Sequence, residues 1–130
     1  MNWILILIAT LTTFALGALW YGPLFAKAWA KASGIDMQQK QGHPARVFGI
    51  SFVFALIAAA GYAHLIGFSD DVLHATLQGA AVGFAFAATS FGINYQFANR
   101  SWQLWLIDGG YHTVQFALYG LVFSALHEVL

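Results

Sequence analysis

The sequence predicts an all-α integral membrane protein, a single domain over residues 1–130 built as a bundle of four transmembrane helices. Hydrophobic residues make up 60% of the chain and charged residues only 8%, whereas a soluble domain carries about 25% charged residues. The apolar residues come in long runs, and a run of about 20 residues is enough to cross the hydrocarbon core of a bilayer. The net charge of zero gives no reason to expect nucleic-acid binding, and the absence of cysteine excludes disulfides and cysteine metal sites.

The first span is expected over residues 2–21, about 30 Å of helix. No Lys or Arg precedes its apolar run, so we interpret it as a retained helix and not as a cleaved signal peptide. The dipeptide Gly22-Pro23 ends it, because proline removes a backbone donor and clashes with the preceding turn. One face of this span carries small or polar residues suited to packing against other helices: Thr10, Thr13, Gly17 and Tyr21.

A short interfacial helix is expected over residues 24–33, where Lys27 and Lys31 share one face and apolar residues lie mostly on others. A solvated loop over 35–44 leads to the second span at 45–66. A turn with capping residues then leads to the third span at 71–97.

Two different faces of the third span carry small or polar residues. The first is a small-residue surface that allows another helix to approach closely, made of Gly79, Gly83, Ala87, Ser90 and Asn94. The second carries His74, Gln78 and Thr89. Besides membrane lipid, the expected partner is a second copy of the chain, and a homodimer would use either the Gly79/Gly83 face or the second face.

The fourth span, over residues 101–128, carries a carboxylate and an imidazole inside an apolar helix. Asp108 and His112 are four residues apart and therefore share a face, which Gln115 and Tyr119 continue. An isolated charge at this depth costs several kcal/mol or more. Three arrangements would relieve that cost: Asp108 could be protonated, it could pair with His112 or Arg100, or it could line a water-filled cleft.

The third and fourth spans form an antiparallel hairpin around residue 99, which brings Asn94 level with Asp108. The end of the first span, with Tyr21, lies on the same side. We therefore predict a polar pocket in this half of the membrane, formed by Tyr21, Asn94, Arg100, Asp108 and His112, with Gln115 above.

Three functions are compatible with this pocket. The leading hypothesis is a transporter-like or ligand-handling protein with Asp108 and His112 as its protonatable centre. The alternative is a structural or accessory protein that binds lipid or a partner protein, in which the polar residues are hydrogen-bonding contacts between helices. A membrane enzyme that uses the two residues as an acid–base pair is the third, although no catalytic signature is present and no catalytic residue is predicted.

Histidines at the other membrane face form a weaker group of candidates for a metal site. Imidazoles and carboxylates bind zinc or copper, and the candidates here are His64, His74, His127 and Glu128. Their spacing matches no recognised metal motif, so neither a metal nor a cofactor is predicted.

Two blocks of sequence resemble a known family. They are Gly17-Ala-Leu-Trp-Tyr-Gly-Pro-Leu-Phe-Ala-Lys-Ala-Trp29, and Asn94 through Asn99-Arg-Ser to Ile107-Asp-Gly-Gly-Tyr-His112. The chain resembles, over essentially its whole length, the small bacterial four-helix membrane proteins of domain of unknown function 1761. The resemblance implies a four-helix fold in a bacterial inner membrane, and it implies no activity, cofactor or site residue.

The charge distribution predicts the orientation. All five basic residues fall in the first and third connections: Lys27, Lys31, Lys40, Arg46 and Arg100. By the positive-inside rule the 22–45 loop and the 98–101 turn are cytoplasmic, and both termini are outside.

Overall fold

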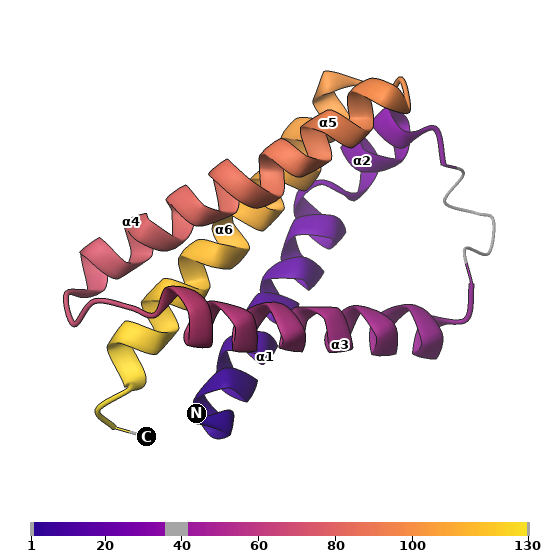
Figure 1. The fold of residues 1–130 in the computed structure, drawn as a ribbon. Helices are drawn as coiled ribbons and strands as arrows, with labels where there is room; N and C mark the ends of the chain where they lie inside the picture. The colour runs from indigo at the N-terminus through magenta and orange to yellow at the C-terminus, as the bar shows by residue number, and fades with distance from the viewer. Residues whose placement is uncertain (1, 36–41, 130) are drawn as a thin grey trace.

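The computed structural model describes residues 2–35 and 42–129, which contain helices and no strands (Figure 1). The six α-helices are α1 (Trp3–Leu19), α2 (Ala26–Ser33), α3 (Pro44–Gly61), α4 (Val72–Val82), α5 (Thr89–Phe97) and α6 (Trp102–Leu126). Three π-helical segments extend or join them: η1 (Trp20–Leu24), η2 (Tyr62–Ile66) and η3 (Gly83–Ala88). The segment η3 joins α4 and α5 into one continuous rod. The predicted all-α class is confirmed.

Three of the rods are long and apolar enough to cross a membrane, and they suggest a membrane protein. They are Trp3–Leu24, Pro44–Ile66 and Val72–Phe97, close to the predicted spans. Large apolar side chains point away from the protein on all three; Leu65 is 79% exposed and Phe97 is 90% exposed. A soluble protein would not leave so many of these side chains in water.

The helix α6 lies at the centre of the fold and packs against α1, against the short α2 and along the whole α4–η3–α5 rod. It is the most buried helix, and among its buried residues are polar ones such as Asp108 and Gln115. It is not among the three apolar rods. Its polar side chains are shielded because the other helices surround it.

The rod and α6 approach backbone to backbone. A Cβ atom built on Gly79 would lie 2.2 Å from the Phe116 carbonyl oxygen, and one on Gly120 would lie 2.1 Å from that of Ala75. The Gly79/Gly83 face is thus used for close helix packing, as predicted, but within the chain. The expectation that this face could instead form a homodimer is wrong, because α6 already covers it.

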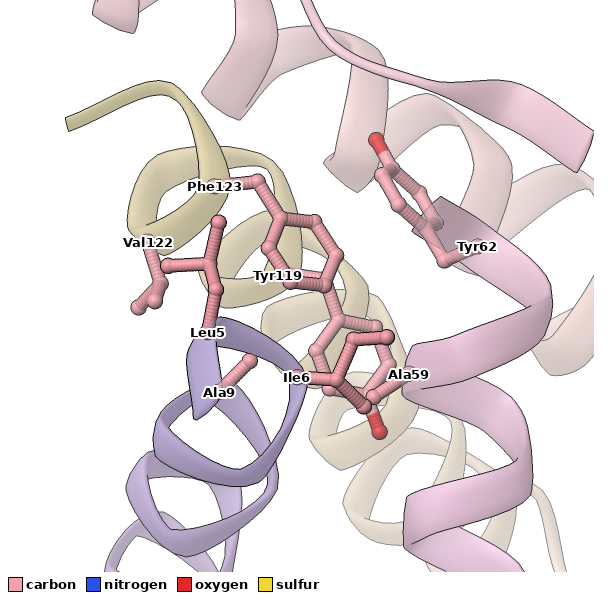
Figure 2. Packing of buried hydrophobic residues seen from close by; sticks show 8 residues of the cluster. All are labelled: Leu5, Ile6, Ala9, Ala59, Tyr62, Tyr119, Val122 and Phe123. Carbon is pink, nitrogen blue, oxygen red and sulfur yellow. The ribbon is translucent and has the colours of Figure 1, made fainter. Parts of the chain in front are cut away.

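The hydrophobic core fills the end of the bundle that holds the termini, where α1, the end of α3 and α6 meet (Figure 2). Its aromatic members come from two elements, Tyr62 from η2 and Tyr119 and Phe123 from α6. The remaining core residues are small or aliphatic: Leu5, Ile6, Ala9, Ala59 and Val122.

The two ends of the bundle are each closed by hydrogen bonds between distant segments. At the end with α2, the Arg100 side chain donates to the Ser33 carbonyl (3.1 Å). At the end with both termini, the Ser124 hydroxyl donates to the Ser69 carbonyl (2.7 Å). The helix predicted over 24–33 is present as α2, which ends at Gly34 in the left-handed conformation (φ 75°). Most of the predicted 35–44 loop, including Lys40, lies outside the described residues.

Candidate functional site

Asp108 lies in the interior of the fold, only 8% exposed, and both of its carboxylate oxygens accept hydrogen bonds from tyrosines of other helices. The Tyr21 hydroxyl, from η1, donates to Oδ1 at 2.6 Å. The Tyr95 hydroxyl, from α5, donates to Oδ2. Hydrogen bonds to a carboxylate are stronger than those between neutral groups, so this one side chain ties three elements together.

The break in the first rod gives Tyr21 its position. At Gly22 the backbone leaves the helical region (φ −104°, ψ −107°), and Pro23 follows directly. The Phe25 amide bonds back to the Trp20 carbonyl (2.9 Å) to close a wide turn. The Trp20 indole then donates to the Ile107 carbonyl (2.9 Å), next to Asp108. The Trp-Tyr-Gly-Pro block therefore forms one wall of the site.

Two further aromatic donors hold α6 against its neighbours near Asp108. The Trp105 indole donates to the Ala88 carbonyl (2.7 Å), and the Tyr111 hydroxyl donates to the Thr13 carbonyl (3.0 Å). Glycines make room for these large rings, since a Cβ on Gly110 would lie 3.1 Å from the Trp20 ring. The two residues that follow Asp108, Gly109 and Gly110, thus lie where the Trp105 and Trp20 rings cover the helix.

The prediction that Asn94 lies beside Asp108 is corrected by the structure. Asn94 is exposed, and the next residue, Tyr95, contacts the carboxylate instead. The reason is η3, because a π-helical turn adds one residue to the rod and rotates all later side chains by about 100°. The face that begins at Gly79 and Gly83 therefore continues through Ala88 and Tyr95, and not through Ala87 and Asn94.

His112 belongs to a second hydrogen-bonded chain. Its Nδ1 lies 2.6 Å from the Gln115 side-chain oxygen. The Gln115 amide donates to the Tyr119 hydroxyl (2.7 Å), and this hydroxyl donates to the Ala55 carbonyl (3.2 Å). Because the Gln115 oxygen only accepts, Nδ1 carries the proton and Nε2 is left as an acceptor. The imidazole is stacked on the Phe91 ring, with centroids 4.8 Å apart.

Neither predicted charge partner of Asp108 binds it. Within the described residues no hydrogen bond or ion pair joins Asp108 to His112 or to Arg100, and its two oxygens accept from the tyrosines instead. Arg100 binds the end of α2 instead. Tyr95 was not predicted as a site residue, and its only signal in the sequence is its place next to Asn94 on the third rod.

A cleft of about 780 Å³ opens between the first rod, α3, the third rod and α6. Its polar side chains are few: Tyr21, Ser51, His112 and Gln115. The rest of its wall is apolar and includes the ring of Tyr111. These residues are Phe14, Gly17, Ala18, Gly22, Val47, Phe48, Phe54, Ala55, Ala58, Ala87, Phe91, Tyr111 and Phe116. Asp108 is not part of the wall and lies behind Tyr21.

The candidate metal ligands separate into two groups. His64 and His74 are exposed and belong to no cluster of potential ligands in the described part of the chain. His127 and Glu128 lie together with Asp70, an aspartate that the sequence analysis did not include.

A sequence model of the family described as protein of unknown function (DUF1761) matches residues 4–124. The chain belongs to this family. The match confirms the resemblance seen in the sequence, and both blocks, the wall at Tyr21 and the Asp108–His112 segment, lie within the DUF1761 region. No curated protein and no solved structure matches the chain.

Proposed function

We propose that this DUF1761 protein is a ligand-handling, transporter-like membrane protein. It takes up a small molecule with a large apolar body and a hydrogen-bonding head group. The observation that carries the proposal is the cleft beside His112. Its volume of about 780 Å³ falls in the usual range of small-molecule sites, roughly 300–1,000 Å³ with a mostly apolar wall and a few polar groups.

The proposal includes four membrane spans. The helix α6 has 25 residues, about 37 Å at the usual rise, and it runs antiparallel to the third rod. Its polar side chains point to other helices, where a bilayer tolerates them. In this arrangement α2 rests on the membrane surface. The basic residues favour the cytoplasmic side of a bacterial inner membrane for α2 and the 98–101 turn, with both termini outside.

The mouth of the cleft would then face lipid. Phe48 and Phe54 of α3 belong to its wall and are 64% and 67% exposed, as expected for side chains at a lipid boundary. Inside, His112 and Gln115 offer an acceptor and a donor to a head group. A molecule entering from the lipid phase would meet apolar surface first and these polar groups last.

Ligand binding would affect the hydrogen bonds of Asp108 through Tyr21. Tyr21 lines the cleft and also donates to Asp108, so a head group that competes for the Tyr21 hydroxyl leaves the carboxylate with one fewer partner. Ligand binding would therefore change the hydrogen bonding of Asp108, which forms the proposed protonatable centre together with His112.

The test uses the purified protein in nanodiscs with a photoreactive probe, palmitic acid bearing a diazirine. We expect peptide mapping to find labels concentrated on cleft residues. Ala87→Leu, which places a larger side chain in the cleft, should reduce this labelling several-fold. The matched control is Ala85→Leu, an exposed position outside the wall, which should leave it unchanged. Labels spread evenly over the lipid-facing surfaces, or equal labelling in both variants, would refute the proposal.

A structural or accessory role is the second candidate, favoured by one observation. Both oxygens of Asp108 are already bound by tyrosines from two other elements, which is what a helix-packing contact requires. In this case Asp108→Asn, whose amide can accept from one tyrosine hydroxyl and donate to the other, should leave the labelling pattern unchanged and the stability nearly so. Under the ligand-handling proposal the same substitution loosens Tyr21 and changes cleft labelling at least twofold.

A further inference from the structure

A cluster of three potential metal ligands lies outside the cleft, at the end of the bundle that holds both termini. The His127 Nε2 atom is 3.0 Å from Asp70 Oδ1 and 3.9 Å from Glu128 Oε1. One ligand atom from each of the three residues lies within 4.8 Å of the others. We propose that Asp70, His127 and Glu128 bind a divalent transition-metal ion of the zinc type.

The orientation of His127 supports this proposal. Its Nδ1 lies 2.9 Å from the Ser124 carbonyl oxygen and 3.1 Å from that of Phe123. Because carbonyl oxygens only accept, Nδ1 is the donor there, and Nε2 is the ring nitrogen that faces the two carboxylates. Metal-binding histidines are held in this way, with the second ring nitrogen donating to a carbonyl or carboxylate. The ring also packs on Phe68, with centroids 4.9 Å apart.

The spacing of the ligand atoms suits a tetrahedral ion. With zinc–ligand bonds of about 2.0–2.1 Å, two ligands of a tetrahedral site are about 3.3 Å apart. The two measured separations, 3.0 and 3.9 Å, lie on either side of this value. The fourth position is open to water. An imidazole nitrogen among the ligands favours Zn²⁺ over Mg²⁺ or Ca²⁺, which prefer oxygen ligands alone.

The segment that carries Asp70 is held from both sides. The preceding residue, Ser69, accepts the Ser124 hydroxyl at its carbonyl (2.7 Å). The following residue, Asp71, caps α4 by accepting from the Leu73 amide (3.0 Å). Asp70 therefore sits between two fixed points, next to the last turn of α6, and a bound ion would connect the 67–71 connection to that turn.

The charge of the cluster also calls for a cation. It brings two carboxylates together. The basic residues of α2 and Arg100 lie at the opposite end of the bundle. A divalent cation would neutralise the charge of both carboxylates and bind the Nε2 atom of His127.

The experiment is a titration of the tag-free protein in nanodiscs with ZnCl₂ at neutral pH, in which isothermal calorimetry measures the binding. We expect one ion per chain and at least tenfold weaker binding in His127→Ala. The matched controls are His64→Ala and His74→Ala, two exposed histidines that should leave the affinity unchanged.

A second variant separates loss of ligands from loss of fold. The side chains of Asp70 and Glu128 are 86% and 81% exposed, so the double variant D70N/E128Q should keep the fold. Its affinity for Zn²⁺ should also be at least tenfold lower than that of the wild type. With Co²⁺ as probe, the wild type should show the visible absorption of a tetrahedral site. The proposal is overturned if the wild type does not bind Zn²⁺, if the double variant binds as well as the wild type, or if MgCl₂ at equal concentration displaces the ion.

Discussion

Replacing Gly120 by alanine should force α4 and α6 apart. The added Cβ would lie 2.1 Å from the Ala75 carbonyl oxygen and 2.8 Å from the carbonyl carbon, whereas ordinary contacts begin at 3.4 Å. Reaching an ordinary distance requires a separation of about 1.3 Å, and gaps of 0.5–1 Å already remove a quarter to a half of the dispersion attraction. The obstacle is the backbone of a helix, which cannot rotate away as a side chain can.

The expected cost follows from this geometry. Forcing extra methyl groups into a packed interior costs about 1–3 kcal/mol. We expect the upper end of this range, about 3 kcal/mol, because the whole contact between the two helices has to open. Gly79→Ala should behave in the same way, since its Cβ would lie 2.2 Å from the Phe116 carbonyl oxygen.

The assay is reversible unfolding in mixed micelles, with helix content followed by circular dichroism as the denaturing detergent increases. The control is Gly49→Ala in α3, where a Cβ has no atom within 4 Å. Alanine is favoured over glycine in a helix by about 1 kcal/mol, so this variant should be as stable as the wild type or more stable. If Gly120→Ala unfolds at the same detergent fraction as the control, α4 and α6 do not pack backbone to backbone and the reasoning fails.

Two further predictions test the site and the end of the bundle. Tyr95→Phe removes one hydrogen bond to Asp108 and should lower stability by about 0.6 kcal/mol, and by no more than about 2. Asn94→Ala, on the exposed side of the same helix, should change it by less than about 0.5 kcal/mol in the same titration. Arg100→Ala removes the donor to the Ser33 carbonyl, so hydrogen exchange should increase in α2 and stay unchanged in α6. If α2 exchanges at the same rate in the variant and in the wild type, the contact between Arg100 and Ser33 does not hold α2.

Most of the fold could be predicted because it depends on long apolar runs and on glycine and proline positions. The spans predicted at 45–66 and 71–97 match the rods Pro44–Ile66 and Val72–Phe97 closely. The rod Trp3–Leu24 includes three residues beyond the predicted end at 21, but its backbone leaves the helical region at Gly22, directly before Pro23. The predicted break at Gly22-Pro23 is therefore present.

The partners of Asp108 could be predicted only in part. Tyr21 was found because the end of the first span and the middle of the fourth must lie in the same half of the bundle. Tyr95 was not found because its place depends on the extra residue of η3. That segment contains no proline, and apart from Gly83 it consists of alanine and phenylalanine. Since glycines also occur in the regular helical parts of this chain, its local sequence does not mark the wider turn. The register of a long helix is therefore uncertain beyond any such turn.

The polar stripe of α6 divides into two parts with different surroundings, and this division connects the two proposed functions. Asp108 is sealed behind tyrosines and acts as a contact between helices. His112 and Gln115 lie on the cleft wall, where the proposed ligand would meet them. Tyr21 belongs to both parts, because its ring lines the cleft while its hydroxyl holds the carboxylate. A ligand that draws Tyr21 toward the cleft must therefore weaken the packing of η1 against α6. Packing and binding are then coupled through one hydroxyl group, and Tyr21→Phe should uncouple them.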